Sequence, residues 1–490
     1  MKSIKLSLVA ALAAGSLTAL SASPLDEAIK NVDVSGFAWY RYDTGRYHSY
    51  SDSFLKEKTV STIGNVMQTH KFKSAVNLKI GLSDNIKVFT QLMYWANANK
   101  GYYNGRSDLT TTANANANTK QEVILRLAGI EYNAFNTKFT LGRQVLGTIW
   151  TDDMAGMAAK AVANVAPGMQ IAAFAVDSFE TNDGDRASGD MYLSLTNNTG
   201  LTTHVDSFFY SHNLYGAAFL GDFGAAKAQV WAAYWHKVGG FAALKVNFDT
   251  PAFGVAFNAL ANFLGDTAKT GNEIATVNIS YGGGAGAAAS STSVASALQA
   301  YNLTKTEVLD NGLFLNLKGK VNFSPVDAFI GVAHYGKKDA LTLNRLEDAN
   351  ADADMAIGRE VSYQKNTWTV LSNGQNTLAY LGVGFKPIRD LRLGIQAVYG
   401  QNTIGKDNIA MIAYAGISNI VAGTPTYNGV KDQKTNVFEG VVEANYKVTP
   451  KLNILAYYSY LHNKIKAVND TDTDTASARN AIRLQVRYGF

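Results

Sequence analysis

The sequence has no cysteine, little charge and no long hydrophobic run, and these shortages exclude several classes of protein. Without cysteine, neither a disulfide framework nor a thiolate metal site can form. Only 17% of the 490 residues are charged, below the roughly 25% that is usual in soluble domains. Beyond the first 22 residues no stretch approaches the roughly 18 consecutive apolar residues of a transmembrane helix. If the mature chain lies in a membrane, only a closed β-barrel can satisfy its backbone there.

What the sequence does contain is typical of strands and turns. Aromatic residues make up 11% of the chain, with 25 Tyr and 23 Phe, and there are 43 glycines. Tyrosine and phenylalanine favour strands, and in barrels they also form girdles at the two membrane interfaces. This composition therefore indicates an all-β protein with many amphipathic rings to place.

The first 22 residues match a secretory signal peptide. Lys2 and Lys5 form its basic start, a short apolar stretch follows, and Ala22 ends a small-residue exit. The alternative, a membrane anchor, is weaker because the stretch cannot span about 30 Å of hydrocarbon as a helix. We expect cleavage after Ala22 and one barrel domain over residues 23–490. Loss of the two lysines lowers the formal net charge from +5 to +3, too mild a charge to imply a nucleic-acid partner.

The remaining chain repeats one unit, which consists of two alternating runs of about ten residues, a tight turn between them, and a long polar loop. In residues 71–80, for example, three lysines and an asparagine lie on one face and four apolar residues lie on the other: Phe72, Val76, Leu78 and Ile80. Proline cannot donate to a strand ladder, so it belongs between strands. Five of the seven prolines fall in the short turns: Pro167, Pro251, Pro325, Pro387 and Pro450.

The pattern predicts a transmembrane antiparallel β-barrel of about 18 strands. A nineteenth candidate, residues 273–281, is assigned to a long loop, because bacterial single-chain barrels have an even number of strands. Alternate connections are short and long, as expected for short periplasmic turns opposite long extracellular loops. The predicted strands are 32–42, 69–82, 85–98, 120–133, 137–147, 157–165, 169–179, 205–219, 225–238, 240–249, 252–265, 311–323, 326–336, 377–386, 390–401, 433–447, 451–463 and 477–490.

The last predicted strand carries the most specific local signal. From Ile482 to Phe490, apolar residues alternate with polar ones or glycine, so one face suits lipid and the other suits water. The chain ends on an aromatic residue. Tyr488 and Phe490 together look like the terminal signal that the outer-membrane assembly machinery reads. The alternative is an edge strand of a soluble protein, which the signal peptide disfavours.

The sequence also resembles the major outer membrane porin family of Campylobacter and its relatives. The resemblance is dense over roughly the first half of the chain and thinner after residue 265. It implies an eighteen-stranded, trimeric, cation-preferring general porin that is also a dominant surface antigen. The residues that carry it are KLSLVAALAAG (5–15), PLDEAIKNVDVSGFAWYRYDTG (24–45), GRQVLGTIWTD (142–152), IAAFAVDSF (171–179) and AQVWAAYW (228–235).

A barrel of this size leaves an aqueous lumen, and its charged lining sets selectivity. A charge facing lipid near the midplane would cost about 2–4 kcal/mol, so alternation places charged strand residues inward. Glutamates on one part of the wall could face arginines on another and create a transverse field. Alternatively, these charges pair with one another and only keep the lumen wet. The predicted lining residues are Lys71, Lys73, Lys79, Arg392, Gln396, Glu439, Glu443, Asn445, Arg483 and Arg487.

The third outer loop, residues 148–156, is the candidate constriction. In general porins the third loop folds into the pore, and here it carries Trp150, Asp152 and Asp153. Two carboxylates there would favour cations and could bind calcium through oxygen, although no cofactor is required. The alternative is a solvated turn. The acidic stretch at residues 470–474 lacks the glycine and the glutamate of a calcium-binding EF-hand loop, so we expect an exposed outer loop.

The sequence therefore predicts a general diffusion porin in the outer membrane of a Gram-negative bacterium. The expected partners are two further copies of the chain in a homotrimer, outer-membrane lipid, the assembly machinery, and small hydrophilic solutes and ions. An enzyme is disfavoured because none of the seven histidines lies in a hydrolase or metalloprotease motif. Two alternatives stay open: a surface-exposed adhesin or antigen barrel, and a substrate-specific channel.

Overall fold

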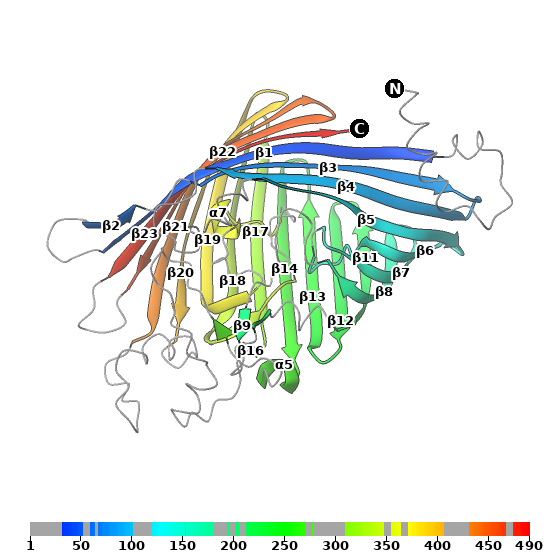
Figure 1. Cartoon of the computed structure of the whole chain (residues 1–490), viewed down its shortest axis with the longest axis horizontal. Coiled ribbons are helices and arrows are strands. Elements are labelled where there is room, and N and C mark those ends of the chain that lie inside the picture. The colour runs from blue at the N-terminus through cyan, green and yellow to red at the C-terminus, as the bar shows by residue number, and fades with distance from the viewer. Residues whose placement is uncertain are drawn as a thin grey trace.

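The computed structural model forms a closed antiparallel barrel (Figure 1), in which β23 pairs with β1 from Phe37 opposite Gly489 to Ser51 opposite Thr475. It describes residues 32–51, 59–63, 67–100, 119–151, 153–180, 194–196, 202–204, 212–270, 277–278, 309–346, 354–363, 371–405, 431–466 and 474–490. The expected signal peptide and its cleavage site lie outside these residues.

Eighteen strands make the wall, which confirms the predicted fold class and strand number. They are β1 (Val32–Ser51), β3 (Met67–Gly81), β4 (Ile86–Lys100), β5 (Thr119–Ala134), β6 (Thr137–Val145), β7 (Ala155–Ala166), β8 (Met169–Phe179), β11 (Leu214–Phe223), β12 (Ala226–Trp235), β13 (Gly239–Asp249), β14 (Phe253–Leu264), β17 (Leu313–Phe323), β18 (Val326–Leu343), β19 (Leu371–Ile388), β20 (Leu391–Ile404), β21 (Gln433–Thr449), β22 (Leu452–Ile465) and β23 (Thr475–Gly489).

Smaller elements belong to the loops. β2 (Thr59–Ile63) extends the pairing of β1, and β16 (Leu309–Asp310) runs parallel to β18. β9 (Ser194–Thr196), β10 (Thr202–His204) and β15 (Val277–Asn278) form a separate small sheet, so the nineteenth candidate is not a barrel strand. The described helices are α5 (Asp266–Thr270) and α7 (Glu360–Tyr363). No helix in the described part of the chain is long and apolar enough to cross a membrane.

Two local predictions were wrong. The predicted strand 205–219 begins at Leu214 and runs on to Phe223, because the turn lies later, at Gly224. The Gly224 φ is +80°, and its N–H donates to Asp222 Oδ1 at 3.1 Å, a turn in which glycine removes the steric cost of positive φ. Pro387 lies inside the end of β19 and not in the turn. It occupies a register shift between Phe385 and Ile388, where a proline is tolerated because a ladder bond is already missing.

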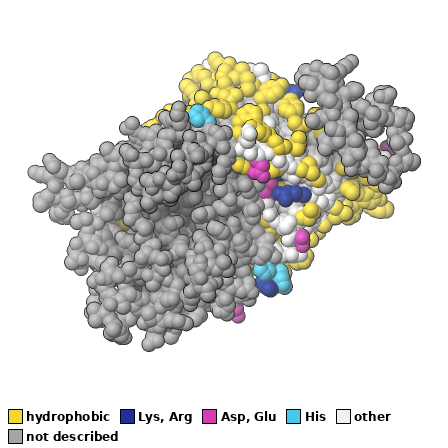
Figure 2. All heavy atoms as spheres, viewed as in Figure 1, with side chains coloured by type: hydrophobic (Ala, Val, Ile, Leu, Met, Phe, Trp, Pro, Cys, Tyr) yellow, Lys and Arg dark blue, Asp and Glu magenta, His cyan; other side chains and the backbone are white. Residues whose placement is uncertain are grey.

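The two faces of the wall differ as the alternation predicts. On β21, Phe438 and Val442 are 41% and 58% exposed on the outside, whereas Glu439 and Glu443 are 0% and 6% exposed on the inside. Figure 2 shows hydrophobic side chains in broad areas of the described surface and charged side chains only in small groups. The outer face therefore suits hydrocarbon, and the inner face carries the polar groups.

The main apolar core lies inside the barrel, between the wall and two inward-folded segments. The first segment is loop 3 (residues 146–154), which joins β6 to β7. The second is loop 7 (residues 344–370), which joins β18 to β19 and contains α7 (Figure 1); its described parts are 344–346 and 354–363. Trp150 of loop 3 and Ile357 of loop 7 are 1% and 0% exposed in this core. The two loops therefore fill part of the interior.

Candidate functional site

Loop 3 turns into the barrel at Gly147. The Gly147 φ is +61°, a left-handed conformation that glycine adopts without steric cost. The Lys160 ammonium, on the inner face of β7, donates to the carbonyl oxygens of Val145 and Leu146 at 3.4 and 3.3 Å. The start of the loop is thus fixed by one glycine and one inward lysine.

The end of loop 3 is fixed by a buried ion pair. The Arg126 and Glu180 side chains are 4% and 3% exposed, and Arg126 Nη2 donates to Glu180 Oε2 at 2.8 Å. The same Nη2 donates to the Asp153 carbonyl oxygen at 2.6 Å, and the Ala155 N–H donates to Glu180 Oε2 at 3.2 Å. The pair therefore holds the backbone on both sides of the point where loop 3 rejoins the wall.

Trp150 attaches loop 3 to the wall and to loop 7. Its ring meets Trp231 and Phe241 edge to face, with centroids 6.1 and 6.0 Å apart, a favourable arrangement for aromatic pairs. Its carbonyl oxygen accepts the Leu346 N–H at 3.1 Å. The two inward loops are consequently one connected structure.

Asp354 makes the first tether of loop 7. Its carboxylate lies 3.5 Å from the Lys245 ammonium and 3.8 Å from that of Lys320, and it accepts Asn247 Nδ2–H at 2.7 Å. Burial by itself would raise the pKa of Asp354, but these two ammonium groups and the amide hold the pKa below its ordinary value of 3.8.

This depressed pKa predicts how the tether responds to acid. A carboxyl group whose folded-state pKa is lowered contributes stability above its unfolded pKa, and the contribution is lost as the pH falls through the folded value. We therefore expect channel conductance to be insensitive to this group between pH 7 and about pH 4 and to change only in more acidic solution. A pH series of single-channel recordings checks this, and Asp354→Asn should abolish the change. An equal acid response in that variant would assign it to other carboxylates.

Glu439 makes the second tether of loop 7, which lies five residues after Asp354, at the start of α7. Its carboxylate accepts the backbone N–H groups of Arg359, Glu360 and Val361 at 3.0, 2.7 and 3.1 Å. Ser459 Oγ–H donates to it at 2.7 Å. The preceding residue, Gly358, has φ +61°, and a Cβ there would fall on the Glu439 carboxylate. The wall glutamate thus binds the first turn of α7 by its backbone, where negative charge is favoured.

The remaining acidic groups beside α7 are also paired. Glu443 accepts Arg359 Nη2–H and Arg392 Nη1–H, both at 2.7 Å, and Arg392 continues to Asp327 at 2.6 Å. Glu360 of α7 accepts the Tyr457 hydroxyl at 3.0 Å. The sequence left a transverse field and mutual pairing as alternatives. The charges are paired, but with other partners than the sequence suggested. Glu439 binds loop 7, and Glu443 binds loop 7 and Arg392, whereas neither binds Arg483 or Arg487 in the described contacts.

The other predicted lining residues lie on the inner face as well. Lys73 is 4% exposed and stands in register between Trp39 and Trp95. The remaining ones are half-buried Lys71, Lys79 with Glu131 at 2.5 Å, Gln396 with Glu443 at 2.8 Å, Asn445 opposite Arg392 in the ladder, Arg483 with Asp43 at 2.5 Å, and Arg487 over the Phe37 ring at 4.7 Å.

The predicted constriction carboxylates are only partly described. Asp152 lies outside the described residues. The Asp153 side chain is 50% exposed, and its carboxylate is 3.7 Å from Arg126 Nη1. Within the described ranges, no group of three or more His, Asp or Glu residues could hold a metal ion. The described part of loop 3 therefore supplies one carboxylate, that of Asp153, and it already lies beside Arg126. A calcium ion would need several oxygen ligands.

Sequence reasoning missed the residues that hold the loops, namely Arg126, Glu180, Asp354 and Arg359. Arg126 could have been suspected from its type, because a cation on a membrane strand needs a partner, although alternation does not fix its side, since Arg126 is skipped at a register shift between β4 and β5. Glu180 directly follows a predicted strand, but nothing local marks it as that partner. Asp354 and Arg359 lie in a loop without periodicity.

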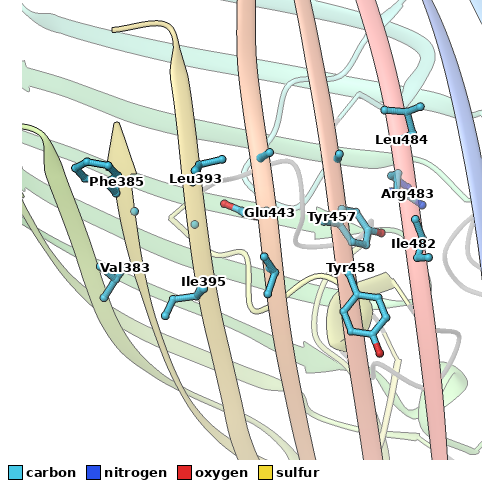
Figure 3. A pocket seen from close by; sticks show the side chains of 15 residues that line it. Val383, Phe385, Leu393, Ile395, Glu443, Tyr457, Tyr458, Ile482, Arg483 and Leu484 are labelled. Atoms are coloured by element: carbon cyan, nitrogen blue, oxygen red, sulfur yellow. The ribbon is translucent and has the colours of Figure 1, made fainter. Parts of the chain in front are cut away.

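The strands beside α7 also carry a groove on their outer side (Figure 3). Its volume is about 670 Å³, and it crosses β19–β23. Its apolar residues, such as Ile395 and Leu484, are 57% and 40% exposed on the outside, whereas Glu443 and Tyr457 of the same strands are 6% and 4% exposed on the inside. The groove therefore lies on the outer face of the barrel and is separate from the lumen.

The terminal residue takes part in closing the barrel. The Phe490 N–H donates to the Gly36 carbonyl at 3.0 Å, and the Gly36 N–H donates to the Phe490 carbonyl at 3.1 Å. The Tyr488 and Phe490 rings are stacked with centroids 6.4 Å apart, and the two residues are 45% and 44% exposed on the outer face. Both aromatic residues are thus accessible at the end of the closing strand.

Comparison with known proteins supports this architecture. A family described as Campylobacter major outer membrane protein matches residues 1–490. No curated protein matches the sequence.

Solved structures of similar shape include a BenF-like porin from Pseudomonas fluorescens Pf-5, which is 10% identical with a TM-score of 0.55, the alignment covering 94% of this chain and 99% of that one. Pseudomonas aeruginosa OpdK, solved with vanillate, is 10% identical with a TM-score of 0.53, over 94% and 98% of the two chains. Pseudomonas aeruginosa OccK2, solved with glucuronate, is 10% identical with a TM-score of 0.51, over 93% and 98%. At these identities the likeness shows the fold alone.

Proposed function

This chain belongs to the Campylobacter major outer membrane protein family, and we propose that it is a general diffusion porin for small hydrophilic solutes and ions, with a preference for cations. It is an outer-membrane β-barrel of the porin kind. The observation that carries the proposal is the pair of tethered loops inside a closed eighteen-stranded wall. Such loops narrow an aqueous lumen without a moving part, and a fixed charged constriction is sufficient for passive, size-limited diffusion.

The proposal also includes removal of residues 1–22 after export, assembly into a homotrimer, and the absence of catalysis and of a required cofactor. The apolar outer face supports contact with lipid, and the accessible terminal aromatic pair supports recognition by the assembly machinery. The long loops are compatible with an additional role as a surface antigen.

The proposal is tested by recording the purified protein in planar lipid bilayers. We expect steady, ohmic channel openings in sodium chloride and a reversal potential of the cation-preferring sign in a salt gradient. A protein that inserts but conducts no ions would contradict a diffusion channel, and an anion-preferring reversal potential would contradict the selectivity.

The sign of the preference is assigned to the loop 3 carboxylates. Replacing Asp152 and Asp153 together with asparagine should lower cation preference in a salt gradient, because fields are focused where low-dielectric walls are close together. The same two residues are the proposed calcium ligands, so the variant should also remove any rise in melting temperature that calcium gives the wild type.

The matched control replaces Asp470, Asp472 and Asp474, which removes three carboxylates from an outer loop. Of these, Asp474 is described and already faces Lys466 at 2.7 Å. If this control shifts the reversal potential as much as the double variant, the selectivity region is not in loop 3.

The assembly role of the C-terminus gives a further prediction. Replacing Phe490 with serine removes an exposed ring but keeps the backbone pairing with Gly36. We expect export across the inner membrane to be unchanged and the amount in the outer membrane to fall severalfold, as measured by fractionation. Phe385→Ser, on another outward ring 47% exposed, is the control. Equal losses in both variants would show that only apolar surface matters.

A further inference from the structure

The groove on the outer side of β19–β23 begins at the end of the barrel that carries the short turns (Figure 3). Among its lining residues, Leu393 lies two residues after the start of β20, and Phe385 lies three residues before the end of β19. In outer-membrane barrels the short turns are periplasmic. The groove therefore starts at the level of the inner leaflet of the outer membrane.

The floor of the groove is made by two alanines. Ala444 of β21 lies opposite Ala456 of β22 in the ladder, and the same outward row continues to Leu393 on one side and to Leu484 on the other. Methyl groups between longer side chains leave a hollow that crosses the strands. Because neighbouring strands lie about 4.8 Å apart, a hollow across five of them is about 20 Å long. Its shape and its apolar lining suit a flexible hydrocarbon chain.

The two turns at this end of the groove are basic. Lys386 and Arg389 lie at the turn from β19 to β20, Lys447 and Lys451 lie at the turn from β21 to β22, and all four are exposed. In the part of the chain that the structure describes, which covers both turns completely, none of the four forms an ion pair. The carboxylates of this region are those of Asp390 and of the C-terminus, where the Gly489 N–H donates to the Lys451 carbonyl at 2.8 Å. Positive charge is therefore in excess here.

Lysines near three other short turns differ, because each lies beside a carboxylate. The pairs are Lys138 with Glu131 at 2.8 Å, Lys227 with Asp222 at 2.9 Å, and Lys320 with Asp249 at 2.8 Å. The cations beside the groove are available to a partner from outside the chain, whereas those three lysines are already neutralised.

We propose that this surface binds one anionic phospholipid of the inner leaflet, with an acyl chain in the groove and the headgroup at the basic turns. Exposed lysine and arginine side chains beside a membrane attract anionic headgroups, and the groove that starts next to them accepts hydrocarbon. A second copy of the chain is the alternative occupant. It would fill the groove but would leave the excess positive charge of the turns without a counter-charge.

The test adds dioleoyl phosphatidylglycerol to the folded, detergent-solubilised protein and counts bound lipids by native mass spectrometry. We expect one lipid per chain to bind the wild type more tightly than later ones. Ala444→Leu with Ala456→Leu fills the floor and should weaken this first binding roughly tenfold, because about two methylene groups lose their place. Arg389→Gln should weaken it about fivefold, the value of one cation beside an anionic lipid. Dioleoyl phosphatidylcholine, which has the same chains but no net charge, should bind more weakly.

Ala379→Leu with Ala397→Leu is the matched control, since both alanines lie on outward rows of β19 and β20 but do not line the groove. The first binding to this variant should stay within about twofold of the wild type. Equal losses in both double variants, or a first lipid bound no more tightly than later ones, would overturn the proposal. So would a groove variant that keeps its lipid but loses an oligomer seen in the wild type, because the groove would then hold a second copy. The barrel can bind this lipid whether or not it conducts, so bilayer recordings test the porin function separately.

Discussion

Replacing Glu439 with alanine is expected to raise single-channel conductance by about twofold or more, because it releases loop 7 from the wall. The carboxylate is fully buried and accepts three backbone N–H groups of loop 7 and the Ser459 hydroxyl. Without it, two buried backbone donors and a part-buried one lose their partner, at about 1–3 kcal/mol for each buried donor. Because these N–H groups can then find acceptors only in water, we expect loop 7 to detach from the wall. Recordings in planar bilayers measure the change, and we also expect greater current noise.

Two further variants distinguish the effect of releasing loop 7 from the effect of removing a negative charge. Glu131→Gln removes a negative charge from the same inner face, where Glu131 pairs with the wall residues Lys138 at 2.8 Å and Lys79 at 2.5 Å, so conductance should change little. Gly358→Ala keeps every charge but places a methyl group against the Glu439 carboxylate, at φ +61°. It should raise conductance as Glu439→Ala does. If Gly358→Ala behaves like the wild type, the first turn of α7 is not what limits the current.

The strands and the inward residues could be predicted because both follow from a period of two. On β21 the residues assigned inward from sequence, Glu439 and Glu443, are buried, and Phe438 and Val442 between them are exposed. Register errors are costly in such a strand, because a shift of one residue would place every charge in lipid. The turn after Phe223 was misplaced because Asp222 and Gly224 form the turn at the end of an unbroken apolar run.

The inward position of loop 3 could be predicted from sequence, but the residues that hold it there could not. Loop 3 was assigned to the interior by analogy with general porins, whose third loop folds into the pore, and its Trp150 is indeed buried. The second inward segment, loop 7, was not found. Its contacts with the wall join residues about 80 positions apart, such as Arg359 with Glu439. Nothing periodic connects such pairs, and a backbone N–H that needs an acceptor leaves no mark in the side-chain pattern.

The Arg126–Glu180 pair gives the largest effect that we expect on stability. Both side chains are almost fully buried, and removing one partner of a buried pair typically costs about 3–5 kcal/mol, because a charge is left without compensation. Glu180→Ala removes the close, buried carboxylate partner of Arg126, leaving the half-exposed Asp153 carboxylate at 3.7 Å, and it removes the acceptor of the Ala155 N–H. We expect a clear drop in the temperature at which the folded barrel loses its β-sheet circular dichroism.

The double variant Arg126→Met with Glu180→Leu decides whether the pair is needed for stability or for position. Replacing a buried ion pair by apolar residues of similar size is often neutral or stabilising, so the double variant should regain most of the lost melting temperature. It cannot restore the bonds from Arg126 to the Asp153 carbonyl or from the Ala155 N–H to Glu180, and loop 3 should therefore stay loose. We expect a stable barrel with reduced ion selectivity. A double variant with wild-type selectivity would show that Trp150 alone keeps loop 3 inside the barrel.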